Sequence, residues 1–231
     1  MNKIDPDLAM RLSQSCKILA AAGHGNMTLG HVTAREPDQP HLHMNAHDLG
    51  LGEIEPKHVL LIDLEGNLLE GDGRKHSEYP IHTEIYKTFP HINCVIHTHP
   101  FYSIIVGTTD ARIKSISHEG SIFDGIPVYK ETSLLIREPE LGQAVAECLG
   151  KHRAMFLRNH GVVVVGESIE EATVYAVLLE RAAKMQVIAA KIGPIHESSP
   201  REVEGKQGQV YYPRNIEGFW KFLVRNLPSD S

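Results

Sequence analysis

The chain has 231 residues and a formal net charge of -6; 42% of its residues are hydrophobic and 23% are charged. This composition is that of a globular protein and excludes collagen-like repeats, coiled coils and wholesale disorder. The negative charge argues against nucleic acid and anionic membranes as partners. No apolar run approaches the roughly 20 residues that span a bilayer, and the first residues lack the apolar core of a signal peptide. The cysteines are widely spaced without a CxxC pair, which is typical of reduced thiols. We therefore expect a cytoplasmic protein without a membrane partner.

Hydrophobic periodicity and capping residues predict helices and strands along the whole chain. The first helix is expected over residues 5–22, capped by Asp5 or Asp7, and the longest over 168–192, begun by a capping box of Ser168 and Glu171. Further helices are expected at 78–89, 101–109, 140–150 and 217–227. Strands are expected at the end of the Gly-rich segment 23–35, at 41–45, in a hairpin over 59–71, at 94–100, 113–117 and 125–130, and as a strand–turn–strand over 154–166.

This alternation predicts one α/β domain over residues 1–231, in which helices cover both faces of a sheet. No repeat and no interdomain linker interrupts it. Residues 193–215 are rich in proline, glycine and charge, so we expect a loop or mobile arm there, within a C-terminal arm of about 193–231.

Histidine is unusually abundant, with 15 in the chain. His97 and His99 lie two apart at the end of an expected strand, so their side chains point to the same side and can bind one cation. A pair of surface histidines is the alternative for this motif alone. His160 occupies a tight turn between apolar strands, where Gly161 can adopt a positive φ. Three neutral imidazoles with an open fourth position form a catalytic metal geometry.

Glu78 begins an expected helix directly after Ser77. A carboxylate at this position is near the positive end of the helix dipole. It could ligate the metal or act as a base, and the alternative for this residue alone is an ordinary charge at a helix start.

These motifs together resemble the class II aldolase/adducin family, the group that includes fuculose-phosphate aldolase. The family pattern is a Ser-Glu at a helix start, then a His-x-His and then a His-Gly. It matches Ser77-Glu78, His97-Thr98-His99 and His160-Gly161 in order and spacing, and the resemblance covers about residues 8–190. The Gly-rich segment 23–35 is similar to the family's Gly-rich loop.

The resemblance implies a single-domain three-layer α/β/α sandwich and a homotetramer with active sites at subunit interfaces. It also implies that His97, His99 and His160 bind one divalent metal ion per subunit, Mn2+ or Zn2+. Glu78 corresponds to the family's catalytic acid/base, which can also ligate the metal. The adducins share the fold but lack these ligands, so the resemblance favours an enzyme over a non-enzymatic scaffold.

The chain departs from the family's sugar-phosphate aldolases where those enzymes hold the phosphate. They have a Ser-Ser pair before the glutamate, whereas here His76 precedes Ser77. They have a Thr-Gly or Ser-Gly loop, whereas residues 44–56 contain neither Thr nor Ser. His31 stands where they often have Asn.

Cationic groups replace those hydroxyls and suit a carboxylated small-molecule substrate, since Arg binds carboxylates bidentately. The expected substrate-binding residues are Arg35, Lys75, His76 and the remaining hydroxyl of Ser77. By the resemblance, His118 lies in a stretch that faces the active site in relatives. Tyr212 lies in a C-terminal arm that reaches a neighbour's site in aldolases.

The sequence thus favours a carbon–carbon lyase of the family's decarboxylase branch, which acts on hydroxylated aromatic or pyridine carboxylates such as 3-hydroxy-2-methylpyridine-4,5-dicarboxylate. The resemblance implies a mechanism in which the metal stabilises the enolate or carbanion left by loss of carbon dioxide. The alternative is a class II aldolase acting on a sugar-derived or 2-keto acid substrate. An adducin-like scaffold is the non-enzymatic alternative.

Overall fold

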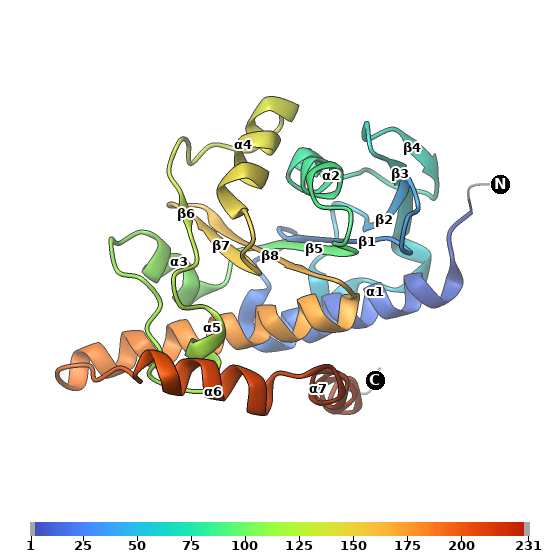
Figure 1. The fold of residues 1–231 in the computed structure, drawn as a ribbon. Helices are drawn as coiled ribbons and strands as arrows, with labels where there is room; N and C mark the ends of the chain where they lie inside the picture. The colour runs from blue at the N-terminus through green and yellow to red at the C-terminus, as the bar shows by residue number, and fades with distance from the viewer. Residues whose placement is uncertain (1–2, 229–231) are drawn as a thin grey trace.

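An eight-stranded mixed sheet forms the centre of the molecule (Figure 1). This computed structural model describes residues 3–228. The strand order is β4-β3-β2-β1-β5-β8-β7-β6, and every neighbouring pair is antiparallel except β6 and β7. The strands are β1 (His31–Ala34), β2 (His41–Asn45), β3 (Val59–Asp63), β4 (Leu68–Glu70), β5 (Cys94–Thr98), β6 (Val128–Tyr129), β7 (Ala154–Leu157) and β8 (Gly161–Gly166).

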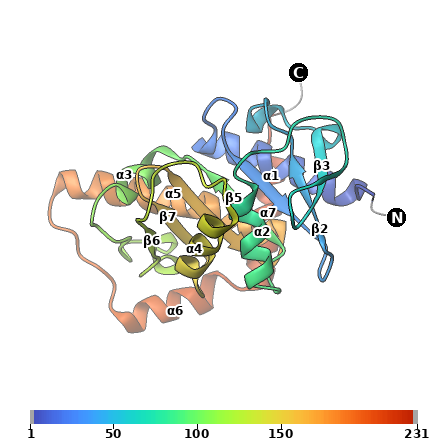
Figure 2. The ribbon, with the colours of Figure 1, turned by 90° about the horizontal axis from the view of Figure 1, so that it is seen from above.

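Helices cover both faces of this sheet, so the predicted three-layer α/β/α sandwich is confirmed (Figures 1 and 2). The α-helices are α1 (Pro6–Leu19), α2 (Tyr79–Thr88), α3 (Phe101–Gly107), α4 (Pro139–Leu149), α5 (Ile169–Ile192), α6 (Pro200–Val210) and α7 (Pro213–Arg225). Helices α2 and α4 lie on one face, and α1 and α5 lie on the other. Among the described residues, none of these helices has the length and apolar character needed to cross a membrane.

Strand alternation divides the buried side chains between the two faces. On β5, Cys94 and Ile96 belong to the hydrophobic cluster beneath α1 and α5, whereas Val95 belongs to the cluster beneath α2 and α4. Because residues two apart share a face, His97 lies on the α2 side. His31 of β1 is its direct cross-strand partner. The sheet register therefore brings two imidazoles together before any loop contributes.

Most expected elements occur within a few residues of their predicted bounds, but the strand expected at 113–117 is wrong. This segment is irregular, and its backbone groups bond to a side chain of α5 instead of a neighbouring strand. Gln186 accepts a hydrogen bond from the Lys114 N–H (2.7 Å) and donates one to the Arg112 carbonyl (2.8 Å). A helix side chain thus makes the hydrogen bonds that a neighbouring strand would make to these backbone groups.

The loop expected over 193–215 is also wrong in part, because α6 lies within it. Ser199 and Glu202 form a reciprocal capping box, and Pro200 occupies the first turn, where its missing N–H costs nothing. The next helix, α7, begins at Pro213 and packs against α5, with Ile216 and Trp220 buried.

Candidate metal centre

Three histidines from two adjacent strand ends converge on one point. His97 is the fourth residue of β5, His99 follows that strand, and His160 lies in the turn between β7 and β8. One ring nitrogen from each can be chosen so that all lie within 4.8 Å of one another. The sequence predicted these three as metal ligands, and the structure brings them together.

The turn that carries His160 differs in detail from the expectation. The positive φ belongs to Asn159, at 59°, and not to Gly161. Gly161 is required for a different reason. A Cβ there would lie 2.5 Å from the Thr98 carbonyl oxygen and 2.8 Å from the His99 ring. Only glycine lets β8 approach the end of β5 so closely, and this approach sets the spacing of the histidines.

Glu78 faces the three histidines from the residue before α2. Its Oε2 lies 3.8 Å from His97 Nε2 and its Oε1 lies 3.6 Å from His160 Nε2. The Ile136 N–H donates to Oε1 at 2.8 Å and so fixes the carboxylate. Burial raises the pKa of Glu78, but the nearby His160, the Ile136 N–H and the charge of His99 outweigh this effect, and the net pKa lies below its usual value.

The protonation of the histidines suits a cation. His97 Nδ1 donates to the Val162 carbonyl at 2.9 Å, so the lone pair is left on Nε2, which has no hydrogen-bond partner. His99 Nδ1 and both ring nitrogens of His160 are likewise buried and without a partner. Burial lowers the pKa of His97 well below its usual range and that of His99 to about 4. Buried polar atoms normally have partners, so these convergent lone pairs fit a divalent metal ion.

A second group of possible ligands overlaps the first and consists of His31, Glu78 and His97. His31 is 3% exposed, and its ring centroid lies 5.0 Å from that of His97. The Nδ1 of His31 lies 2.6 Å from Nε2 of His82, which is fully buried on α2. His31 was noted from the sequence only as a departure from the phosphate-binding pattern, so its contact with the centre was missed.

A small cleft of about 110 Å³ opens beside the centre. It is lined by Leu29, Gly30, His31, His47, His76, Ser77, Glu78, His99, Leu135 and Arg137. Of the substrate-binding residues predicted from the sequence, it contains His76 and Ser77. His76 is buried, and its Nε2 accepts a hydrogen bond from Asn45 Nδ2 at 3.2 Å. The sequence analysis missed Leu135 and Arg137, whose loop after β6 shows no periodic pattern or motif.

Two of the predicted cationic residues are bound elsewhere in this chain. Lys75 Nζ donates to the Gly66 carbonyl and lies 3.9 Å from the centroid of the Tyr79 ring, in the direction of the β3–β4 hairpin. Arg35 follows β1 at the end opposite His31. Its guanidinium donates to the carbonyls of Pro90 (2.7 Å) and Ile92 (3.2 Å).

The remaining two predicted substrate residues lie on the α5 side of the molecule. His118 precedes a short turn of helix (Glu119–Ile122) that packs against α5 and α6. Tyr212 is the N-cap residue of α7 and is 42% exposed. Within one chain, the structure brings neither of them to the histidines.

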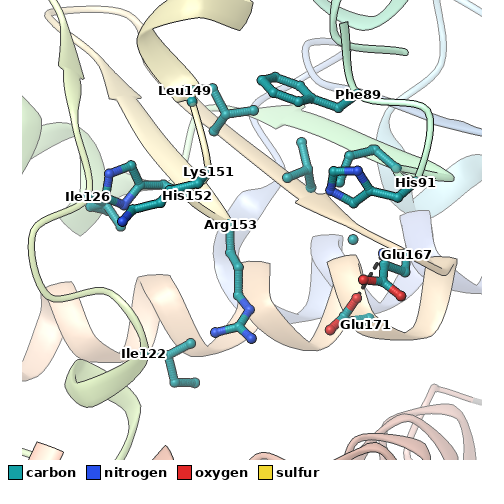
Figure 3. A pocket seen from close by; sticks show the side chains of 14 residues that line it. Phe89, His91, Ile122, Ile126, Leu149, Lys151, His152, Arg153, Glu167 and Glu171 are labelled. Atoms are coloured by element: carbon teal, nitrogen blue, oxygen red, sulfur yellow. Dashed lines mark hydrogen bonds between the residues drawn. The ribbon is translucent and has the colours of Figure 1, made fainter. Parts of the chain in front are cut away.

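A larger cleft, of about 480 Å³, lies at the opposite ends of the central strands, where β8 ends and β7 begins (Figure 3). Phe89, His91 and Leu149 border it on one side, and Arg153 and Glu171 approach it from the other. None of the possible metal-binding groups found among residues 3–228 includes a residue that lines it. Volume therefore does not mark the chemical site in this fold.

Comparison with known proteins agrees with the site. A family model described as the class II aldolase and adducin N-terminal domain matches residues 10–187. The chain therefore belongs to the class II aldolase/adducin family.

Relatives that are named for different reactions are similar to the chain in sequence. A 3,4-dihydroxyphthalate decarboxylase from Arthrobacter keyseri is 27% identical over 195 residues, covering 79% of this chain and 78% of the relative. An L-fuculose phosphate aldolase from Methanococcus maripaludis is 29% identical over 163 residues, covering 69% of this chain and 84% of the relative. One relative is thus named as a decarboxylase and the other as an aldolase.

The fold is shared still more widely. The crystal structure of an aldolase II superfamily protein from Pseudomonas syringae superposes with a TM-score of 0.87 at 22% identity, covering 98% of this chain and 94% of that one.

Proposed function

We propose that this protein is a divalent-metal-dependent carbon–carbon lyase that decarboxylates a hydroxylated aromatic or pyridine carboxylate. The observation that carries the proposal is the convergence of unpartnered imidazole nitrogens from His97, His99 and His160 with the Glu78 carboxylate. A purely structural domain would gain nothing from burying these groups without partners.

His97, His99 and His160 would hold the ion, Mn2+ or Zn2+, and Glu78 would complete the set. When bound, the ion supplies Lewis-acid stabilisation of negative charge on substrate oxygens. Glu78 is the group placed to move a proton, since it is buried, lies within 4 Å of His97 and His160, and is fixed by the Ile136 N–H. In the ionised form that its lowered pKa favours, Glu78 would take the proton of the substrate's ring hydroxyl and then deliver it to the ring carbon that has lost carbon dioxide.

Decarboxylation is favoured over aldol cleavage by the lining of the cleft. Imidazoles of His31, His47 and His76 occupy it together with Arg137, and its one hydroxyl-bearing residue is Ser77. Donors of this kind suit a carboxylate. The decarboxylase from Arthrobacter keyseri supports this choice of reaction. The aldolase from Methanococcus maripaludis supports the second candidate, an aldolase acting on a sugar-derived or 2-keto acid.

We also propose a cytoplasmic homotetramer with active sites at subunit interfaces. His118 and Tyr212 lie away from the histidines of their own chain, so a role for either in substrate binding would need a neighbouring subunit. Arg35 and Lys75 are held by carbonyl groups of their own chain. A substrate role for them would require those bonds to break, which makes His76 and Ser77 the stronger proposals.

Carbon dioxide release tests the proposed reaction. The protein is reconstituted with Mn2+ or Zn2+ and supplied with ortho-hydroxy benzoates, hydroxyphthalates and hydroxypyridine carboxylates, with and without a chelator. Chelator-sensitive release from one of these compounds is the expected result. If none of these compounds releases carbon dioxide and the protein instead condenses pyruvate or glycolaldehyde with aldehydes, the aldolase replaces the decarboxylase as the proposed function.

A further inference from the structure

Two buried polar side chains connect the segment that carries His97 and His99 to α5, on the face of the sheet opposite the metal centre. One is His24, which ends an irregular helical turn (Ala20–His24) that follows α1. The other is Glu180 of α5 itself. His24 is fully buried and Glu180 is 7% exposed. Both are polar groups in a layer that is otherwise filled by the hydrophobic cluster beneath α1 and α5.

His24 binds the residue between the two histidine ligands of β5. Thr98 shares the α5 face of this strand with Ile96. Its hydroxyl lies 2.9 Å from Nδ1 of His24, and Nε2 of the same ring lies 3.1 Å from the Ala176 carbonyl oxygen. A carbonyl can only accept, so Nε2 carries the hydrogen, and burial lowers the pKa of His24 to about 4, which keeps the ring neutral near pH 7. The Thr98 hydroxyl therefore donates to Nδ1, and one imidazole joins β5 to α5.

The local sequence explains how His24 reaches this position. The turn Ala20–His24 follows α1 directly, and Gly23 within it has a φ of 88°. Residues with a side chain rarely adopt this conformation. No atom lies within 4 Å of where a Cβ of Gly23 would be, so the backbone and not close packing requires the glycine. The turn thus ends α1 and places His24 between α5 and the end of β5.

Glu180 binds the chain just beyond His99. Its carboxylate accepts hydrogen bonds from the N–H groups of Tyr102 (2.9 Å) and Ser103 (2.9 Å) and from the Ser103 hydroxyl (2.7 Å). These N–H groups belong to the first turn of α3, where an N-cap side chain usually binds them. The N-cap residue of α3 is Pro100, which makes no such bond. Glu180 therefore supplies the missing cap from another helix.

The two contacts lie one helical turn apart on α5. Ala176 and Glu180 are four residues apart, so they lie on the same side of the helix. This side holds Thr98 on one side of His99 and the start of α3 on the other. Such support matters because the ligands of a metal site must be held within about 0.5 Å of their binding geometry.

We infer that His24 and Glu180 are positioning residues of the metal centre, which hold His97 and His99 in the arrangement that binds the ion. The inference rests on the metal dependence in the proposed function. It adds that the affinity for the ion is controlled from the opposite face of the sheet. A merely structural role would stabilise the fold but leave the metal affinity of the folded protein unchanged.

Zinc affinity of the full chain tests the role of His24. The metal-free protein competes with a chromophoric chelator for Zn2+, and the visible absorption of the Co2+-loaded protein reports the ligand geometry. His24→Leu and Thr98→Val should each weaken Zn2+ binding by about tenfold, the lower end of the usual effect of groups that orient metal ligands. Both should alter the Co2+ absorption. The double variant should bind about as tightly as either single variant, because all three lack the same contact.

A conservative variant separates positioning from packing at this contact. Thr98→Val keeps the shape of the side chain and loses the hydroxyl, so it tests the contact even where His24→Leu fails to fold. Thr98→Ser keeps the hydroxyl and should restore Zn2+ affinity close to that of the wild type. Unchanged Zn2+ affinity and unchanged Co2+ absorption in Thr98→Val would overturn the role of His24.

Glu180 has its own pair of variants. Glu180→Leu removes all three hydrogen bonds, and Glu180→Gln keeps the shape with one acceptor oxygen in place of two. Zn2+ binding should weaken in both variants, and less in Glu180→Gln. Wild-type affinity in Glu180→Gln, with or without a folded Glu180→Leu, would overturn the role of Glu180.

Thr173→Val is the matched control on the same helix. Thr173 is fully buried, and its hydroxyl lies 2.6 Å from that of Ser15 on α1. The variant removes a buried hydrogen bond of α5 that does not involve the segment of the ligands. It should destabilise the fold as Thr98→Val does, but leave Zn2+ affinity and Co2+ absorption unchanged. Equal losses of affinity in the two variants would overturn the positioning role.

Failure of this inference and failure of the proposed function are distinguishable, because the affinity is measured without substrate. Weaker Zn2+ binding in Thr98→Val, without carbon dioxide release by the wild type, keeps the positioning role and rejects the decarboxylase. Carbon dioxide release by the wild type, with unchanged Zn2+ affinity in Thr98→Val and Glu180→Gln, rejects the positioning role alone.

Discussion

The two edges of the sheet at which its central strands begin and end differ, and the difference locates the candidate site. The edge beside His97 and His160 has a cleft of about 110 Å³, whereas the edge bordered by Phe89 and Arg153 has one of about 480 Å³. At the small cleft, buried imidazole nitrogens of His97, His99 and His160 converge without partners. At the large cleft, Glu171 accepts a hydrogen bond from the Glu167 N–H, so this carboxylate is already used (Figure 3). Unsatisfied groups aimed at one point, and not the size of a hollow, distinguish the site.

A single strand spans both edges. His31 begins β1 at the small cleft, and Arg35 follows the same strand at the other end, where it binds the carbonyls of Pro90 and Ile92. The four-residue strand thus presents an imidazole nitrogen without a partner at one end, and it is followed at the other end by a guanidinium that binds two backbone carbonyls. One end is available to a ligand, and the other stabilises the fold.

The largest effect is expected when two of the proposed metal ligands beside the small cleft are removed. His97→Ala combined with His99→Ala should abolish turnover by a factor of about a thousand or more, because a metal that stabilises developing charge is lost. Steady-state assays of metal-supplemented protein measure it. His91→Ala, a histidine lining the large cleft, is the matched control and should retain full activity. Equal losses in both variants would erase the distinction between the edges.

Glu78→Gln separates proton transfer from metal binding at the same edge. The amide keeps the shape and the hydrogen bond from the Ile136 N–H, but it cannot exchange a proton at this position. Turnover should fall by about 10²- to 10⁴-fold, the usual contribution of general acid–base catalysis, while most of the metal is retained. Normal turnover in this variant would contradict the acid–base role.

Acid should destabilise the metal-free protein through its buried histidines. Burial lowers the pKa of His24 and of His43 to about 4 and that of His82 to about 3, below the value of about 6.5 for an unfolded chain. As pH falls below about 6.5, the unfolded chain therefore binds protons that the folded one does not. Stability is present above this range and is lost towards pH 4, by up to about 1.4 kcal/mol per histidine per pH unit. Urea unfolding at pH 7, 6 and 5 measures the loss, and a constant free energy of unfolding would contradict it.

Arg35→Met should give the smallest effect, and on stability alone. The variant leaves the Pro90 and Ile92 carbonyls without their donor and removes the contact of the guanidinium with the Tyr86 ring at 4.7 Å. A loss of about 1–3 kcal/mol in the free energy of unfolding is expected, with KM unchanged. A raised KM with unchanged stability would instead return Arg35 to the substrate.

The sequence could predict what depends on local pattern. The strand at 41–45 coincides with β2, and the two-residue spacing of His97 and His99 places their side chains on one side of a strand end. The sequence could not predict contacts between elements that lie far apart along the chain. The approach of His31 to His82 spans 51 positions and depends on how α2 sits on the sheet.

Arg35 illustrates a second limit. It follows a glycine-rich segment close to the site in sequence, yet four residues of extended strand, at about 3.3 Å each, carry it roughly 13 Å away. The loop that provides Leu135, the Ile136 N–H and Arg137 has no periodicity, so its three contributions to the site could be found only in three dimensions.

Metal stoichiometry tests the central claim most directly. The protein is stripped with a chelator, titrated with Zn2+ and with Mn2+, and analysed by mass spectrometry of the bound metal after gel filtration. The account predicts one ion per chain in the wild type and in His91→Ala, and none in the double variant of His97 and His99. A wild-type chain that binds no ion, or a double variant that binds as much as the wild type, would contradict it.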